Sequence, residues 1–189
     1  QWAVQNGAQV INISLGTNSD IQSFHDAITT TYNAGVVLVA AAGNDSGAVD
    51  YPGAYPEVIA VSATDSSNNL ASFSSRGTEV DLSAPGVSIF STYKGTGYKT
   101  LSGTSMASPH VAGSAALVLN TPTDTHFETV TASSSTYTYC ASEYDTNCNY
   151  AWDTWEVKNK LQNTAVDLGV AGYDTWYGFG LVNAWNAVQ

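Results

Sequence analysis

Two short apolar runs separated by an amphipathic stretch constrain the fold of this chain more than any other feature. The first run covers residues 10–15 and ends at Gly16, and the second extends from Val36 to Ala42. Between them, large side chains recur at helical spacing: Ile21, Phe24, Ile28 and Tyr32. Near-continuous apolar strands joined by a helix are typical of a parallel sheet that is covered on both faces. The sequence therefore predicts an α/β fold.

The ends of that first helix and the elements after it can also be predicted. Ser19 or Asp20 is expected to cap the helix, and Gly35 to end it. Two more apolar runs, Val58 to Ala63 and Val87 to Phe90, predict further strands.

A long stretch from Thr104 to Leu119 contains almost only small and apolar residues, which predicts a helix that is buried on all sides. Trp155 to Leu161 predicts another helix. Together, these elements predict three layers, with a mostly parallel sheet flanked by helices.

Residues Thr121 to Asp153 differ from the rest of the chain. They are rich in Thr, Ser, Tyr and Asp and follow neither a helical nor a strand period, so we expect a surface insertion within one domain that covers residues 1–189. Cys140 and Cys148 both lie here. Their spacing allows a disulfide, the favoured interpretation in a secreted protein, whereas two unpaired buried thiols are the alternative.

The charge balance excludes several classes of partner. Sixteen acidic and five basic residues give a net charge of -11, which argues against nucleic acid and anionic membrane surfaces as partners. The longest apolar stretches have seven residues, so no transmembrane helix is predicted. The acidity fits solubility; salt adaptation competes, although only 11% of residues are charged, against about 25% in typical globular proteins.

One motif places a serine where nucleophilic chemistry is favoured. In Gly103 to Gly113 (GTSMASPHVAG), Ser105 stands between a glycine and the predicted buried helix. Unpaired N–H groups and the helix dipole at such a position favour the negative charge of a tetrahedral intermediate. A serine can also merely begin a helix there, and residue chemistry alone leaves both interpretations open.

The same eleven residues resemble, nearly position for position, the nucleophile motif of the subtilisin-like serine proteases. Further matches follow in the family's order: Asn12 to Gly16 (NISLG), Ala41 to Asn44 (AAGN), Phe73 to Ser75 (FSS), Ala84 to Gly86 (APG) and Gly178 to Asn183 (GFGLVN). The resemblance covers most of the chain except Thr121 to Asp153. It implies the C-terminal part of a subtilisin-like peptidase domain, with a sheet that is incomplete on its N-terminal side.

The resemblance also implies roles for individual residues. Ser105 would be the acylated nucleophile, and Asn44 would donate its side-chain amide to the oxyanion together with the backbone N–H of Ser105. Extended substrate backbone would pair with the strand end formed by Ser14, Leu15 and Gly16. The other wall of the S1 pocket would be formed by Ala41, Ala42 and Gly43. For these residues, turns and ordinary strand ends are the alternatives.

Two further positions match the family less directly. Asp50 aligns near the bottom of the S1 pocket, where a carboxylate could attract Lys or Arg at P1; a solvated loop aspartate is the alternative. A group of carbonyls and one carboxylate resembles a cation site that could take a structural calcium ion, formed by Gly53, Tyr55, Val58 and Asp81. Its occupancy stays open, and no cofactor is expected for catalysis. Tyr51 to Pro52 matches a place where relatives carry a cis peptide.

No histidine of this chain has the setting of a catalytic base. His110 lies five positions after Ser105, roughly 140° around the same helix, and His25 and His126 lack the glycine-rich surroundings of the family's catalytic histidine. The family order is Asp, His, Ser, so the two missing members are expected before Gln1.

The missing sequence affects what we expect of the piece itself. Alone it should be inactive and poorly stable, with unpaired strand edges and exposed apolar surface. The expected partners are polypeptide substrates and the missing N-terminal part of the domain, and the expected location is extracellular, after secretion. A peptide-binding pseudoenzyme is the rival interpretation, whereas an esterase lacks support because no GxSxG motif is present.

Overall fold

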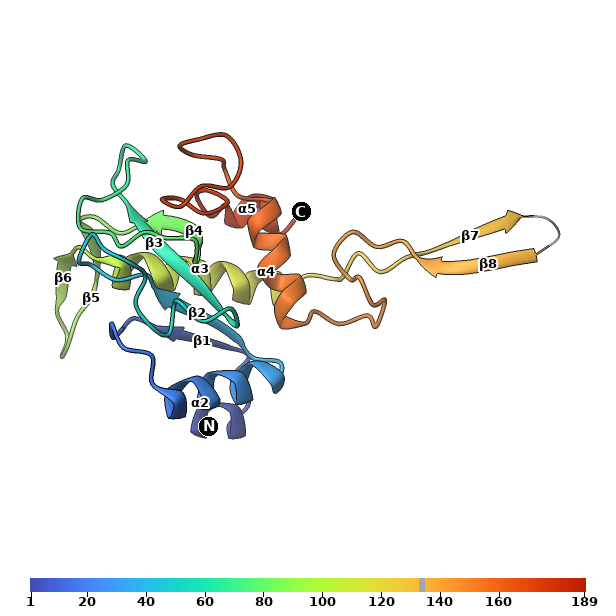
Figure 1. Ribbon diagram of the computed structural model, residues 1–189, viewed down its shortest axis with the longest axis horizontal. Coiled ribbons are helices and arrows are strands. Elements are labelled where there is room, and N and C mark those ends of the chain that lie inside the picture. Colours follow the sequence, from blue (N-terminus) through green and yellow to red (C-terminus); the bar gives the residue numbers. More distant parts are fainter. Residues whose placement is uncertain (133–134) are drawn as a thin grey trace.

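A parallel sheet of four strands forms the centre of the protein, as a computed structural model of residues 1–132 and 135–189 shows (Figure 1). Its strands follow one another in space as they do in the sequence: β1 (Val10–Ile13), β2 (Val37–Ala41), β3 (Val58–Thr64) and β4 (Val80–Pro85). Every neighbouring pair is parallel. The predicted α/β fold is confirmed.

Helices cover both faces of this sheet, because the strands β2 and β3 are apolar on both sides. Alternate residues such as Val39 and Val61 pack against α3 (Thr104–Leu119). The intervening residues, such as Leu38, pack on the opposite face against Ile28 of α2 (Gln22–Asn33). Every residue of β2 and β3 is buried, and each such Val, Leu or Ile side chain contributes about 1.5–3 kcal/mol by leaving water.

The remaining helices are α1 (Trp2–Gln5), α2 (Gln22–Asn33), α4 (Thr154–Asn163) and α5 (Ala184–Ala187). Helices α4 and α5 join the cluster around α3 through Val157, Leu161 and Ala187. The described residues 1–132 and 135–189 contain no helix that is both long and apolar enough to cross a membrane.

Helix α2 starts later than the sequence suggested. Its N-cap is Ile21, which supplies no side-chain hydrogen bond, so the prediction of Ser19 or Asp20 as the cap is wrong. The Asp20 carboxylate instead accepts a hydrogen bond from the Tyr55 hydroxyl at 2.8 Å. The Asp20 side chain therefore makes a tertiary contact instead of the helix cap that the local pattern predicted.

Strand β4 is absent from the sequence prediction, which identified strands by continuous apolar runs, whereas in β4 the apolar residues alternate with Asp81, Ser83 and Pro85. The strand predicted over Val87 to Phe90 is shifted and lies outside the sheet. It is β5 (Ile89–Thr92), which forms a separate antiparallel hairpin with β6 (Tyr98–Leu101).

Helix α3 has the predicted bounds, but it is not buried on all sides. One stripe of the helix is exposed, formed by Pro109, His110, Gly113, Ala116 and Leu117. The Leu117 side chain is 51% exposed. These positions recur every three to four residues, so they form one face, and nothing in the described chain covers it.

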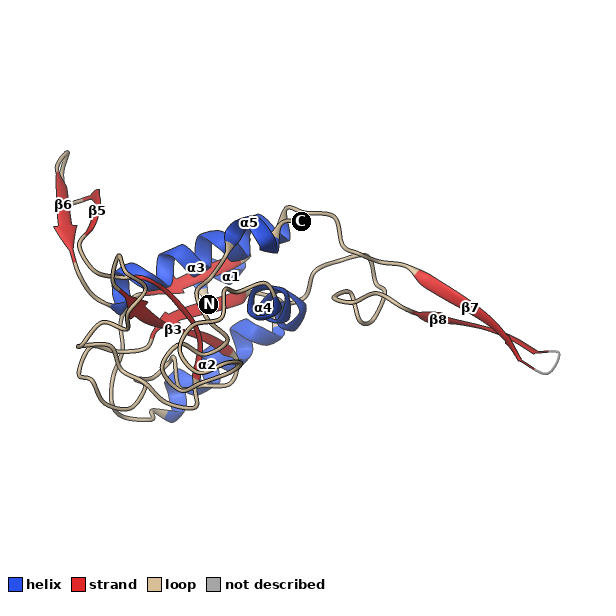
Figure 2. Cartoon of the chain, turned by 90° about the horizontal axis from the view of Figure 1, so that it is seen from above, coloured by secondary structure: helices blue, strands red, loops and turns tan. Residues whose placement is uncertain are grey.

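A second hairpin projects from the body of the molecule, as Figures 1 and 2 show. It consists of β7 (Phe127–Ala132) and β8 (Ser135–Cys140) within the segment for which we expected no regular structure. Threonines pair across one face of the hairpin, while Tyr137 and Tyr139 stay exposed. Since neither face enters the core, the sequence shows no apolar alternation from which the strands could be predicted.

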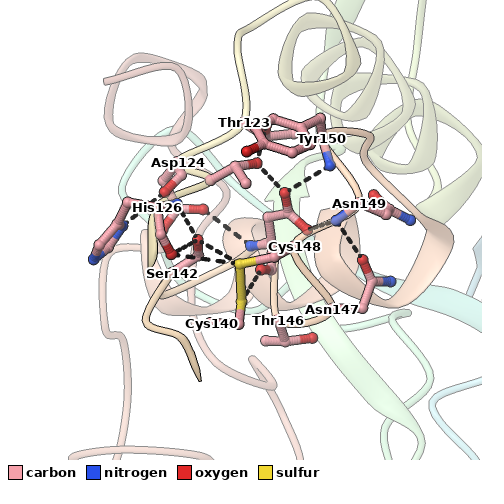
Figure 3. Close-up of a disulfide and its surroundings, with 12 residues drawn as sticks. Thr123, Asp124, His126, Cys140, Ser142, Thr146, Asn147, Cys148, Asn149 and Tyr150 are labelled. Atoms are coloured by element: carbon pink, nitrogen blue, oxygen red, sulfur yellow. Dashed lines mark hydrogen bonds between the residues drawn. A yellow bond between two sulfur atoms is a disulfide. The ribbon is translucent and has the colours of Figure 1, made fainter. Parts of the chain in front are cut away.

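The base of this hairpin is held by a disulfide and by a buried polar network (Figure 3). Cys140 and Cys148 are bonded, with their Cα atoms 5.8 Å apart, as predicted. The Asp124 carboxylate accepts hydrogen bonds from three successive backbone N–H groups, those of residues 143–145, at 2.6–3.3 Å. The fully buried Glu156 carboxylate, in the capping box of α4, accepts one from the N–H of Thr146 at 2.9 Å.

Candidate active site

Ser105 lies in the first turn of α3, next to the end of β1. Its Oγ donates a hydrogen bond to the carbonyl oxygen of Ser14 at 3.3 Å, and the Oγ of Ser14 donates to the carbonyl oxygen of Ser105 at 2.9 Å. One turn further, the Ser108 hydroxyl donates to Oδ1 of Asn12 at 2.5 Å. These bonds fix the start of α3 against the end of β1, so the Ser105 hydroxyl faces the strand end that was predicted to pair with substrate.

Asn44 approaches the same helix end from the end of β2. Its Oδ1 accepts hydrogen bonds from the backbone N–H of Thr104 at 2.8 Å and from the Thr104 hydroxyl at 3.1 Å. A backbone N–H can only donate, so the oxygen of the amide must face Thr104. The Nδ2 group of this exposed side chain is left to donate elsewhere.

Two nitrogen atoms that can donate hydrogen bonds lie near the bare backbone of Gly103. A Cβ placed on Gly103 would lie 3.7 Å from the backbone nitrogen of Ser105 and 3.8 Å from Nδ2 of Asn44. Both nitrogens therefore lie within 4 Å of one point beside Gly103, and Oδ1 of Asn44 lies 3.5 Å from the same point. Two convergent donors next to a hydroxyl are the arrangement that stabilises an oxyanion.

Thr104 orients Asn44, a role that the sequence did not reveal. Its buried hydroxyl lies 3.2 Å from both the nitrogen and the carbonyl oxygen of Gly43, in addition to its contact with Asn44. Its only signal in the sequence is its place directly before Ser105 in the motif. Thr104 thus ties the start of α3 to the end of β2.

Asp50 lies between the two predicted walls of the S1 pocket. A Cβ on Gly43 would lie 2.6 Å from Oδ2 of Asp50, and one on Gly16 would lie 2.8 Å from Cβ of Asp50. Gly43 also has a φ of +112°, which favours glycine. Thr17 and Tyr51, the residues that follow Gly16 and Asp50, exchange two backbone hydrogen bonds of 2.8 Å, which fixes Asp50 at this place.

The Asp50 side chain is partly buried. Burial, and the negative charge of Asp45, raise the pKa of the Asp50 carboxyl above its ordinary value. The Ser75 hydroxyl would lie 2.8 Å from the same Cβ on Gly43, is buried, and has no hydrogen-bond partner among the described residues. A carboxylate and an unpaired hydroxyl thus flank the backbone of Gly43.

A cavity of about 380 Å³ opens on the other side of Ser105. It is lined by the start of α3, including Met106 and His110, and by residues of the β5–β6 hairpin. Ser105 is therefore one of the residues that border an open cavity.

The three histidines have partners other than Ser105. His110 Nδ1 lies 2.8 Å from the carbonyl oxygen of Met106, on its own helix. His25 stacks on Tyr55, and its Nε2 lies 3.3 Å from Glu57. His126 Nδ1 lies 2.9 Å from the carbonyl oxygen of Asp124. Within residues 1–132 and 135–189, no hydrogen bond joins an imidazole to Ser105.

At the predicted cation position, a lysine side chain contacts two of the predicted ligands. Nζ of Lys158, from α4, lies 2.9 Å from Oδ1 of Asp81 and 3.3 Å from the carbonyl oxygen of Val58. The Asp81 carboxylate also accepts hydrogen bonds from Gln162 and from the N–H of Ala60, at 2.9 and 3.0 Å. These contacts fit an ammonium group, which already uses one oxygen of Asp81 and the carbonyl oxygen of Val58, two of the four predicted ligands. The described residues contain no group of three or more His, Cys, Asp or Glu side chains that could hold a metal ion.

Comparison with known proteins agrees with this geometry. The sequence model of the subtilase family matches residues 1–180. The chain belongs to the subtilase family. Subtilisin DY of Bacillus licheniformis is 43% identical to all of this chain, and subtilisin Savinase of Lederbergia lenta is 40% identical over 97% of it. The minor extracellular protease Epr of Bacillus subtilis (strain 168) is 40% identical over 96%.

The chain spans only part of these relatives. It covers 60% of subtilisin DY, 58% of subtilisin Savinase and 24% of Epr. A parallel sheet with β1 at its edge, and an uncovered stripe on α3, agree with a subtilisin-like fold that is incomplete in these residues.

Proposed function

We propose that this chain forms part of a serine endopeptidase that cleaves peptide bonds by acyl transfer through Ser105. The observation that carries the proposal is that Asn44 Nδ2 and the backbone nitrogen of Ser105 lie within 4 Å of one point beside Gly103, with Oδ1 of Asn44 held by the N–H of Thr104. A further support is that the similar proteins are subtilisins and a protease by name.

In the proposed reaction, the Ser105 oxygen attacks the carbonyl carbon of the scissile peptide. The carbonyl oxygen becomes an oxyanion, which accepts hydrogen bonds from Asn44 and from the N–H of Ser105. Collapse of this intermediate releases the amine and leaves an ester on Ser105, and water then hydrolyses the ester. The helix dipole of α3 adds to the stabilisation of the negative charge.

The proton of the Ser105 hydroxyl needs a base, and we propose that the base and its carboxylate partner lie outside these 189 residues. The support is that the three histidines of the chain contact Met106, Glu57 and Asp124 instead, and that the chain spans 60% or less of the relatives named above. The chain alone is then inactive, and its sheet edge and the exposed stripe of α3 are where the remaining part of the domain would pack.

We further propose that Asp50 makes the S1 pocket selective for Lys or Arg at P1. The support is its place between Gly43 and Gly16, together with the unpaired Ser75 hydroxyl beside it. A cationic side chain that enters between the two walls would meet the Asp50 carboxylate and would find a second polar group in Ser75. Extended substrate backbone would pair with Ser14 to Gly16.

We propose an extracellular location for the protein. The Cys140–Cys148 disulfide is of the kind that persists in oxidising surroundings, and one relative is named as an extracellular protease.

The test of the proposed activity uses the full-length protein that carries this chain. It is incubated with a fluorophosphonate, which reacts with activated serines, and the labelled residue is identified by mass spectrometry. Labelling of Ser105, with loss of casein cleavage in Ser105→Ala and normal cleavage in the exposed control Ser67→Ala, is expected. An unlabelled Ser105 in a folded protein that still binds peptides would instead identify a pseudoenzyme.

A further inference from the structure

Helix α4 places a cation in a small cavity that is also lined by residues of β3 and β4. The cavity has a volume of about 230 Å³, and Glu79, Asp81 and Lys158 are among its lining residues. The Lys158 side chain is only 22% exposed and the Asp81 side chain 14%. A basic side chain is rare in this chain, which has five against sixteen acidic residues, and this one is mostly withdrawn from water.

The ammonium of Lys158 joins three separate elements. Its 2.9 Å contact with Asp81 reaches β4, and its 3.3 Å contact with the carbonyl oxygen of Val58 reaches the first residue of β3. Gln162, one turn further along α4, donates to the same Asp81 oxygen at 2.9 Å. A carboxylate and a backbone carbonyl are oxygen donors that also suit a hard metal ion.

We propose that Lys158 replaces a metal ion in this chain, so that β3, β4 and α4 are held together by an internal ammonium group. Oxygen donors that converge on a cavity need a positive charge, and Lys158 supplies it through a covalent tether. A tethered cation cannot be removed by a chelator or by dilution. The contacts at this position are therefore independent of calcium.

The proposal predicts that removal of the ammonium group creates a metal site. In Lys158→Met the oxygens of Asp81 and Val58 lose their cation, while Glu79 adds a second carboxylate to the same cavity. Calcium can then bind there, and binding to the folded state alone raises its stability. The midpoint of thermal unfolding, Tm, should rise in CaCl2 by roughly 5 °C more in Lys158→Met than in the wild type.

The measurement compares Tm in millimolar CaCl2 with Tm in EDTA, for the full-length protein that carries this chain. The matched control is Lys160→Met, which removes another cation from the same helix. The Lys160 ammonium lies over the ring of Tyr144, 4.1 Å from the ring centre. The calcium-dependent rise of Lys160→Met should equal that of the wild type. Lys158→Arg retains the positive charge and should also behave like the wild type.

Two results would overturn the proposal. One is an equal calcium-dependent rise in Lys158→Met and the wild type. The other, which does not require Lys158→Met to fold, is a calcium-dependent rise of the wild type that becomes smaller in Asp81→Asn, since this would show that Asp81 already binds calcium beside Lys158.

Discussion

Replacement of Asp50 by asparagine tests the proposed substrate preference. The Asp50 side chain lies against the bare backbone of Gly43 and Gly16, with the Ser75 hydroxyl beside it at Gly43. Asparagine has nearly the same size, so the substitution removes the charge and keeps the packing. We expect a selective loss of cleavage after arginine, with little change in cleavage after phenylalanine.

The size of the loss follows from the type of contact. A hydrogen bond between charged groups contributes about 1.5–3 kcal/mol, and each 1.36 kcal/mol changes a rate about tenfold. The kcat/KM for a P1 Arg peptide should therefore fall roughly 10- to 150-fold. Because burial and Asp45 raise the pKa of Asp50, the preference for Arg should already decline at a pH above the ordinary aspartate range, as the carboxylate takes up a proton.

The assay measures kcat/KM for two peptides that differ only in Arg or Phe at P1. Asp45→Asn is the matched control, since it removes a neighbouring and exposed carboxylate that is not among the groups nearest to Gly43. It should leave the Arg preference in place and move its pH dependence to lower pH, because it removes one cause of the raised pKa. An Arg-to-Phe ratio that is unchanged in Asp50→Asn would refute the role of Asp50 in the S1 pocket.

Three other predictions concern stability. Thr104→Val leaves the N–H of Gly43 without its acceptor, so the free energy of unfolding measured in urea should fall by about 1–3 kcal/mol. Thr104→Ser keeps the hydroxyl and should retain the wild-type value. Burial raises the pKa of Asp124, but hydrogen bonds from the backbone N–H groups of residues 143–145 outweigh it and hold the pKa below its usual value. This stabilisation is present above the unfolded pKa of about 3.9 and is lost as the pH falls through the folded pKa, so Asp124→Asn should lower stability at neutral pH and reduce its dependence on acid; an unchanged acid dependence would contradict this. The isolated 189-residue chain should bind a dye for apolar surface at the exposed stripe around Leu117, whereas a cooperative monomer without dye binding would contradict the incomplete fold.

The sequence predicted well those elements whose residues are buried by the sheet itself. Strands β2 and β3 are buried throughout and mostly apolar because both of their faces are covered, and α3 has the predicted bounds. Strand β4 escaped prediction because it has no continuous apolar run: Asp81, near its start, contacts Lys158 of α4, and Ser83 also separates its apolar residues. The β7–β8 hairpin escaped because both of its faces are exposed.

Local patterns were equally limited at the candidate site. The motif indicated Ser105 and Asn44, and the structure places them together. The roles of Thr104 and Lys158 depend on contacts with partners that lie 60 and 100 residues away, which no local pattern contains. Asp50 was assigned by resemblance alone, and only the close approach of Gly43 and Gly16 supplies a physical reason for its place.

The most direct test of the central claim is a crystal structure of the full-length protein with a peptide boronic acid, which forms a covalent bond with an activated serine. We expect boron on Oγ of Ser105, with one boronate oxygen about 2.7–3.1 Å from both Asn44 Nδ2 and the backbone nitrogen of Ser105. A boronate bound to Ser105 whose oxygens all lie away from Asn44, or boron bound to another residue, would contradict the proposed site.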